Sequence, residues 1–168
     1  FLSGTIHTVE IGKGIVRIGN NAFYNLQSLE YLKFTDENVV EVIEGAAFAK
    51  CTNLTVAELE KCTNLKRIEN NTVPNSGFSG AFACTGLTSI NLPPNMEYIG
   101  IYGFYDCNNL LEVNLSDIQQ IGGMCFFHCD RLNKVTLDKI EVLGGSTFSG
   151  CSQIQEVVHI RFGNPESM

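Results

Sequence analysis

Hydrophobic residues recur along this chain at a constant interval, and the polar residues between them keep the same spacing. Phe82, Phe104, Phe126 and Phe148 each stand 22 residues apart. Their surroundings repeat with them, in the pattern I-G-x-x-A-F-x-x-C-x-x-L-x-x-V-x-L. Copies of this pattern start at Ile18, Ile43, Ser79, Ile99, Ile121 and Leu143, and a half-copy covers Ile6 to Ile11. A period of this length indicates a repeat architecture.

Each copy predicts two extended segments. The L-x-x-V-x-L part ends in alternation of apolar and polar residues, which is typical of a half-buried strand. A second apolar pair, such as Ile118 and Ile121, predicts another short strand or extended segment. The glycine after this pair, as at Gly100 and Gly122, indicates a tight or left-handed turn. We expect the A-F-x-x-C segment to lead to the next strand as one helical turn.

No single copy can bury its own apolar residues, so the copies must stack to form a continuous core. Strands of neighbouring copies would then pair in parallel at roughly 4.8 Å. The expected fold is a solenoid of six to seven repeats of about 22 residues. Parallel β-strands form one face of it, and short strands, turns and single helical turns form the rest.

The pattern resembles the leucine-rich repeat, and within it the BspA-like class, whose repeat reads I-G-x-x-A-F-x-x-C-x-x-L-x-x-V-x-L-P. The copy from Gly80 through Pro93 matches it closely, and the resemblance covers roughly residues 6–160. It implies a curved solenoid with its parallel strands on the concave face. It also implies a cell-surface or secreted protein of a bacterium or parasitic protist that functions in adhesion. The partner implied is a host protein, such as one of the extracellular matrix.

Composition and charge narrow the classes of partner. The 168 residues carry a net charge of −7, and the eleven basic residues are scattered, which argues against nucleic acid or anionic lipid as a main partner. No apolar run approaches the length of a membrane span, so direct membrane insertion is not expected. The chain starts with Phe1 and shows no signal peptide. We interpret residues 1–168 as a single leucine-rich repeat domain, excised from a longer chain and monomeric.

Three residues suggest metal or thiol chemistry at first sight, namely Cys125, His128 and Cys129. The repeat argues against it, because Cys129 occupies a position that Leu26 fills in the first copy, which predicts an apolar core site. His128 falls on an exposed position, so the three side chains would not converge on a metal. We place Cys51, Cys84, Cys107, Cys129 and Cys151 in one buried column and expect free thiols. Cys62 lies outside this column, and we expect it to be the most reactive cysteine.

The repeat is interrupted between Phe48 and Phe82, which stand 34 residues apart. Three extra residues lie between Leu59 and Leu65 and nine within residues 69–81, a stretch rich in Asn, Ser, Gly and Pro that predicts a surface loop. Such insertions often carry recognition, although a tolerated length variant is the simpler explanation. Candidate contact residues in this loop are Asn70, Asn71, Asn75 and Phe78.

Alternation along the predicted strands places two columns of side chains on the outer face. This face is polar and of mixed charge, which suits a weak, hydrated contact with a protein or glycan; a solvated face without a partner is the alternative. Its candidate contact residues are Tyr31, Lys33, Glu58, Asn91, Glu112, Asn114, Lys134 and Thr136. The hypothesis is therefore a binding module that needs no cofactor, with a structural spacer as the alternative. Dispersed carboxylates and histidines, with no catalytic motif, make an enzyme the least favoured class.

Overall fold

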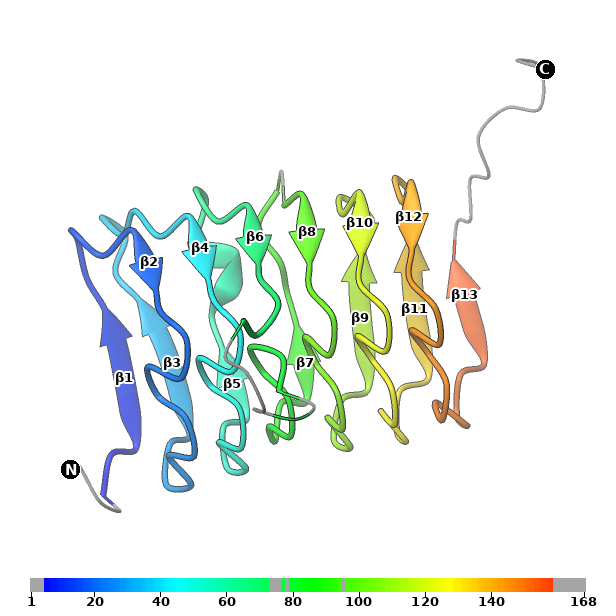
Figure 1. Cartoon of the computed structure of the whole chain (residues 1–168), viewed down its shortest axis with the longest axis horizontal. Helices are drawn as coiled ribbons and strands as arrows, with labels where there is room; N and C mark the ends of the chain where they lie inside the picture. The colour runs from blue at the N-terminus through cyan, green and yellow to red at the C-terminus, as the bar shows by residue number, and fades with distance from the viewer. Residues whose placement is uncertain (1–4, 73–76, 78, 95, 159–168) are drawn as a thin grey trace.

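The computed structural model describes residues 5–72, 77, 79–94 and 96–158, and these form a parallel β-solenoid (Figure 1). One side is built from strands of two to four residues, most of them longer than those of the other side: β1 (Thr8–Ile11), β3 (Tyr31–Phe34), β5 (Val56–Ala57), β7 (Ser89–Ile90), β9 (Glu112–Leu115), β11 (Lys134–Leu137) and β13 (Glu156–Val158). A second side is built from two-residue strands: β2 (Arg17–Ile18), β4 (Val42–Ile43), β6 (Arg67–Ile68), β8 (Tyr98–Ile99), β10 (Gln120–Ile121) and β12 (Val142–Leu143). The expected solenoid and both extended segments of the repeat are confirmed.

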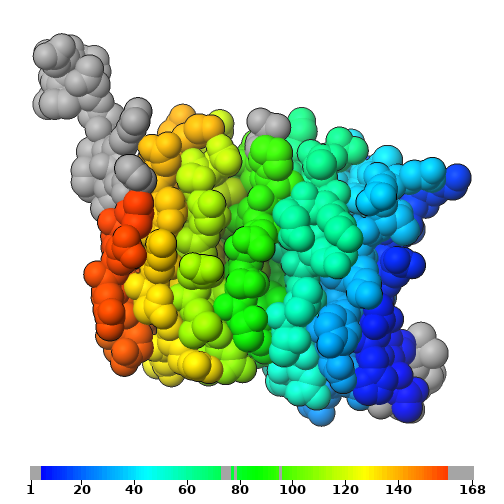
Figure 2. Space-filling model, turned by 180° about the vertical axis from the view of Figure 1, so that it is seen from behind, coloured from blue at the N-terminus to red at the C-terminus, as the bar shows by residue number. Residues whose placement is uncertain are grey.

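The two sides differ in continuity. The two-residue strands form one six-stranded parallel sheet in the order β12-β10-β8-β6-β4-β2, which we call the short-strand sheet. The longer strands form two sheets, β1-β3-β5 and β13-β11-β9-β7, and the structure gives no pairing between β5 and β7. We call the outward side of these two sheets the long-strand face (Figure 2). The sequence predicted one uninterrupted column of strands here, and that prediction is wrong.

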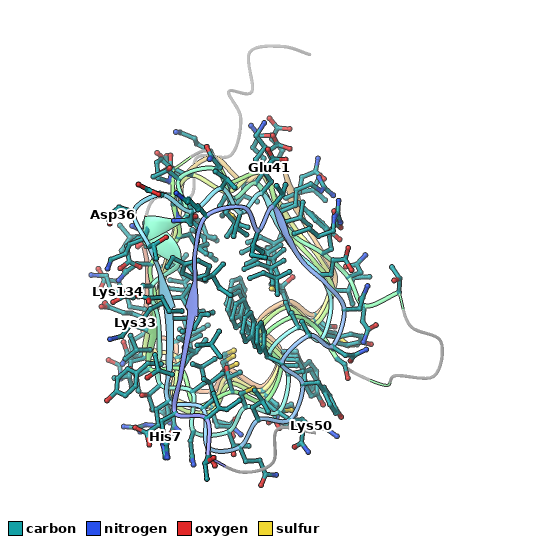
Figure 3. The ribbon with its side chains drawn as sticks, turned by 90° about the vertical axis from the view of Figure 1, so that its left-hand side faces the viewer. His7, Lys33, Asp36, Glu41, Lys50 and Lys134 are labelled. Atoms are coloured by element: carbon teal, nitrogen blue, oxygen red, sulfur yellow. The ribbon has the colours of Figure 1, made fainter. Side chains whose placement is uncertain are left out.

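A column of phenylalanine rings runs through the centre of the solenoid (Figure 3). Neighbouring rings are stacked, with centroids 5.1 Å apart for Phe23 and Phe48 and 5.5 Å apart for Phe126 and Phe148. Phe48, Phe82, Phe104 and Phe126 are completely buried. The predicted stacking is confirmed, but Phe148 in the last described repeat is only partly buried.

The A-F-x-x-C segments, which we call the Phe arc, contain consecutive tight turns instead of the expected helical turn. The residues two before and two after the Phe adopt left-handed backbone conformations, as at Met124 (φ 53°) and His128 (φ 56°). The Cys129 N–H donates to the Phe126 carbonyl (3.3 Å), which closes a turn with His128 at its third position. Non-glycine residues pay roughly 1–2 kcal/mol for this conformation. Hydrogen bonds to the next repeat, such as Met124 N–H to Gly145 O (2.9 Å), offset that cost.

The glycines after the second strand serve close packing rather than a left-handed turn. Gly122 and Gly144 do not have positive φ angles. A Cβ atom on Gly122 would instead overlap the backbone of Ile101, and one on Gly144 would overlap the backbone of Gly123. Glycine is required here because the backbones of adjacent repeats touch.

The three extra residues after β5 form η1 (Leu59–Lys61), a single turn of 3-10 helix. This turn buries Leu59 and Cys62, so the prediction of a reactive Cys62 is wrong. Asn38 fixes η1 to the preceding repeat, because its Nδ2 donates to the Thr35 carbonyl (2.7 Å) and to the Lys61 carbonyl (2.9 Å). Within the described residues, no helix is long and apolar enough to cross a membrane.

Candidate functional site

The long-strand face presents its predicted residues in two columns, whose alignment follows from parallel pairing. Tyr31 lies opposite Val56, and Glu112 lies opposite both Ser89 and Lys134. Between these outward residues, the alternate side chains are buried in the core, as in β9, where residues at positions 112 to 115 are exposed, buried, exposed and buried. The first predicted column consists of Thr8, Tyr31, Val56, Ser89, Glu112, Lys134 and Glu156. It runs as predicted within each sheet, but the break separates it into two parts.

The half before the break contains the aromatic residue of the face. Tyr31 is 40% exposed, and the Lys33 ammonium lies 5.8 Å from its ring centroid, within the range of a cation–π contact. The neighbouring Val56 is also exposed. This half therefore combines one ring, one cation and an apolar side chain.

Glu58 keeps its place beside Lys33 in the second predicted column, because its N–H donates to the Leu32 carbonyl at 3.0 Å. That column consists of Glu10, Lys33, Glu58, Asn91, Asn114, Thr136 and Val158. Strand β5 ends at Ala57, and Glu58 precedes η1, where its carboxylate pairs with the Lys61 ammonium at 2.9 Å. Its side chain is only 24% exposed. The alignment of Glu58 with Lys33 therefore agrees with the backbone register, while the ion pair with Lys61 occupies the Glu58 carboxylate.

The half after the break brings five predicted residues together around one shallow hollow of about 230 Å³. These residues come from three neighbouring repeats: Asn91, Glu112, Asn114, Lys134 and Thr136. The Lys134 ammonium lies 4.0 Å from the Glu156 carboxylate, and the Asn114 Oδ1 accepts a hydrogen bond from the Ser116 N–H at 3.2 Å. Four of the five lie on the paired strands β9 and β11, and Asn91 directly follows β7, so their backbones are held in place before any ligand arrives.

The insertion loop is described only in part, and Asn75 and Phe78 lie outside the described residues. Asn70 has a structural role, because its Oδ1 accepts hydrogen bonds from the Tyr98 hydroxyl (2.9 Å) and the Ile101 N–H (2.5 Å). Asn71 is partly buried. The side-chain Oδ1 of Asn70 thus holds the insertion against the next repeat, which makes Asn70 a weaker contact candidate than the sequence suggested.

The cysteine–histidine group of the sequence does not form a site. Cys125 and Cys129 are fully buried, whereas His128 is exposed and its Nδ1 lies 3.8 Å from Asp130. Among the described residues there is no cluster of His, Cys, Asp and Glu that could hold a metal ion. The predicted divergence of these three side chains is confirmed.

The buried thiols also act as hydrogen-bond donors, which the sequence did not reveal. Cys129 Sγ donates to the Phe104 carbonyl (3.3 Å), and Cys151 Sγ donates to the Phe126 carbonyl (3.0 Å). Each thiol therefore bonds to the preceding repeat. In the first copy no earlier Phe carbonyl exists, which explains why Leu26 can fill the position there.

Cys84 is not part of this column, contrary to prediction. It is half-exposed and has a left-handed conformation (φ 57°), so it corresponds to Asp106 and His128 in later repeats. Thr85 takes the buried place, and its hydroxyl donates to the Phe82 carbonyl at 2.9 Å. The sequence alignment matched Cys84 to the cysteines of the other copies and was wrong by one position, because the turn after Phe82 is one residue shorter than in those copies.

Burial keeps the thiols of Cys51, Cys62 and Cys107 protonated. It raises the pKa of Cys51 to about 11 and the pKa of both Cys62 and Cys107 to about 12. A reactive thiolate requires a lowered pKa and access to solvent, so these three side chains are structural.

Comparison with known proteins finds solved structures that resemble this solenoid. A crystal structure of a leucine-rich repeat protein from T. pallidum superposes with a TM-score of 0.79 at 27% identity, covering 94% of this chain and 71% of that chain. The pneumococcal vaccine antigen PcpA gives a TM-score of 0.48 at 16% identity, over 90% of this chain and 39% of that chain. A leucine-rich repeat protein from Bacteroides ovatus gives 0.44 at 21% identity, over 88% and 47%. A search of curated protein sequences finds no match.

The family assignment rests on the repeat itself. A model of the BspA-type leucine-rich repeat region matches residues 1–81 and 78–161, with six copies of the repeat. These matches cover nearly the whole chain, and they agree with the stacked strands and the Phe arcs described above. The chain therefore belongs to the family of BspA-type leucine-rich repeat proteins.

Proposed function

We propose that this chain is a non-enzymatic binding module of a cell-surface or secreted protein, and that it functions in adhesion through its long-strand face. The observation that carries the proposal is the hollow on β7, β9 and β11, where five polar side chains from three repeats converge. Family membership supports a surface location, because BspA-type repeats occur in bacterial surface proteins.

The chemistry of this face suits recognition better than catalysis. The hollow contains one carboxylate, Glu112, one ammonium, Lys134, and otherwise amide and hydroxyl groups. Such groups can bind and orient a partner by hydrogen bonds and bridging water. The partner proposed here is a host macromolecule such as an extracellular-matrix glycoprotein.

Charge reversal on the face tests the proposal. The measurement is surface plasmon resonance of the chain against a panel of extracellular-matrix glycoproteins, comparing wild type with Lys33→Glu and Lys134→Glu. We expect Lys134→Glu to weaken a positive interaction about fivefold or more, because it reverses a charge inside the contact. Lys50→Glu is the matched control, since Lys50 lies on the Phe arc, away from Lys33 and Lys134 (Figure 3).

Each variant must melt within about 2 °C of wild type, because all three lysines carry solvent-exposed charges. An interaction that responds to Lys50→Glu but not to either of the others would move the contact off this face. A chain that binds no member of the panel would favour the spacer function.

A further inference from the structure

Three hollows lie beside β9 and the residues that flank it. The central one, described above, shares Asn91 and Asn114 with a smaller hollow of about 70 Å³ that also includes Ser116 and Asp117. A third, of about 380 Å³, lies at the other end of β9 beside Leu111. The first two hollows are continuous through their shared residues, and the third adjoins them only through the neighbouring positions of Leu111 and Glu112. We call the three together a polar track; its central strand, β9, is about 13 Å long at about 3.3 Å per residue.

The charged residues that line each hollow are matched by opposite charges, and Glu156 lies 4.0 Å from Lys134 just outside the central hollow. Glu112 and Lys134 face the central hollow, and Asp130 and Arg131 face the hollow beside Leu111. At the far end, Asp117 is paired with Lys139 at 2.6 Å. The chain as a whole carries a net charge of −7, so local neutrality is a property of this track rather than of the surface in general. A polyanion or polycation would find no complementary field here.

The lining offers many hydrogen-bonding groups and little apolar surface. Amides predominate, with Asn91 and Asn114 in the central hollow and Asn133, Gln153 and Gln155 in the hollow beside Leu111. Each amide supplies both donors and an acceptor. In the central hollow the apolar residues Ile90 and Val113 are 3% and 2% exposed, so they offer almost no contact area, whereas Leu111 in the third hollow is 37% exposed. Tight protein contacts rely on several buried aromatic or aliphatic anchors, and the central hollow supplies none.

We propose that this track, here called the β9 track, binds an uncharged oligosaccharide that lies along β9. The hydroxyl groups of a neutral saccharide both donate and accept, which matches an amide-lined and charge-balanced surface. The inference rests on the proposed function and sharpens it: the recognised part of the host glycoprotein is its glycan.

Direct titration tests the proposal. The probes are chitotetraose, maltotetraose, cellotetraose and mannotetraose, with a heparin tetrasaccharide as the anionic comparison, each added to the isotope-labelled chain and followed by amide chemical shifts. We expect at least one neutral probe to give saturable shifts at Asn91, Asn114 and Thr136. Its Kd should change less than about twofold between 0.05 and 0.5 M salt, since no net charge is neutralised. Preferential binding of the heparin probe would overturn the proposal.

Point variants then localise the contact. Asn114→Ala should weaken binding of the neutral probe by about tenfold, because Asn114 lines two of the three hollows. Thr136→Val replaces the hydroxyl by a methyl group of similar volume, and it should weaken binding of the neutral probe severalfold without altering the fold. Asn108→Ala is the matched control, since Asn108 is an exposed amide beside the Phe arc that bonds to Asp106. Equal affinity of the wild type, Asn114→Ala and Thr136→Val would overturn the proposal.

A second arm separates this inference from the proposed function. Each matrix glycoprotein that binds the chain is tested before and after enzymatic removal of its glycans. Loss of binding on deglycosylation supports the saccharide. Unchanged binding that still responds to Lys134→Glu overturns the saccharide and leaves the proposed function standing, whereas absence of binding to every probe and every protein overturns both.

Discussion

The short-strand sheet passes without interruption through six repeats, while the long-strand side of the same repeats is divided between β5 and β7. The repeats on either side of the break still touch elsewhere. On the Phe arc, the Phe48 N–H donates to the Ala81 carbonyl and the Lys50 N–H donates to the Ala83 carbonyl, both at 2.8 Å. The break is therefore confined to one side of the solenoid.

The positions of extra and missing residues explain the difference. The chain has extra residues between β5 and Phe82, yet β6 pairs with both β4 and β8. Leu87 follows Phe82 by five residues, whereas Leu110 follows Phe104 by six. Extra residues can leave the stack as a loop, but a missing residue cannot be replaced, and we attribute the break at β7 to this deficit. A solenoid of this kind tolerates insertion better than deletion.

The largest expected effect is on the phenylalanine column where the long-strand sheets are not joined. Phe82 stacks on Phe48 and on Phe104, with centroids 5.3 Å away on each side. Replacement of this fully buried ring by alanine should cost roughly 3–5 kcal/mol of unfolding free energy. Phe126→Ala should cost about the same, because Phe126 is equally buried.

The two variants should differ in cooperativity. Phe82→Ala removes packing across the break and should separate the unfolding of the two parts, giving urea transitions by circular dichroism and by tyrosine fluorescence that no longer coincide. Phe126→Ala lies inside a joined sheet and should keep one transition. A loss below about 1 kcal/mol in either variant would contradict the central position of the ring.

The next effect tests how closely the shortened turn approaches its neighbour. A Cβ atom on Gly86 would lie 2.5 Å from the carbonyl oxygen of Thr52. Gly86→Ala should therefore destabilise the chain by about 1–3 kcal/mol, the usual range for overpacking. Gly145→Ala is the control, since nothing lies within 4 Å of its Cβ position. Equal melting temperatures for the two variants would show that the turn can relax.

The sequence predicts the structural features that recur in every repeat, and it does not predict those that occur in a single copy. Six matching copies determine the buried column that contains Phe104 and Phe126, because each position is read several times. Cys84 occurs in an irregular copy, and there the alignment matched the cysteine by residue type, whereas the hydrogen bonds place Thr85 in the buried position. One sequence signal pointed to the donor role of Cys129: the first copy has no preceding Phe carbonyl to accept a hydrogen bond, and it has Leu26 at the position where later copies have cysteine. The hollows along β9 depend on the relative lengths of side chains on three strands, which no single repeat contains.

The buried thiols predict a loss of stability at high pH. The pKa of Cys107 is raised to about 12 by burial, whereas an unfolded thiol titrates near about 8.5. Above that pH the unfolded state binds fewer protons than the native state, so the unfolding free energy falls as pH rises. The contribution of one thiol is about 1.4 kcal/mol per pH unit, and it is fully present below about pH 8.5.

A variant without the thiol isolates this contribution. Cys107→Thr places at this position the residue that Thr85 already provides in the preceding copy. The unfolding free energy of both proteins is measured with urea between pH 8 and pH 11. It should fall less steeply with pH for Cys107→Thr, by a slope that corresponds to about one bound proton. In the native protein at pH 8, a thiol reagent should label the half-exposed Cys84 and Cys151 first. Prompt labelling of Cys62 or Cys107 would contradict their burial.

The smallest expected effect is a repair of the break. Insertion of one asparagine between Gly86 and Leu87 restores the six-residue spacing from Phe82 and should let β7 pair with β5. Each new backbone hydrogen bond contributes about 0.5–1.5 kcal/mol, partly offset by ordering of the added residue, so a net gain near 1 kcal/mol is expected. Hydrogen exchange should slow at the amides of Ser89 and Asn91, which correspond to the Val56 and Glu58 amides that donate to the preceding repeat. Gly86→Ala should become less costly in the repaired chain. The same insertion before Leu132, in a repeat of regular length, is the control and should destabilise. If both insertions destabilise and the Ser89 amide exchanges as before, the break has a cause other than the missing residue.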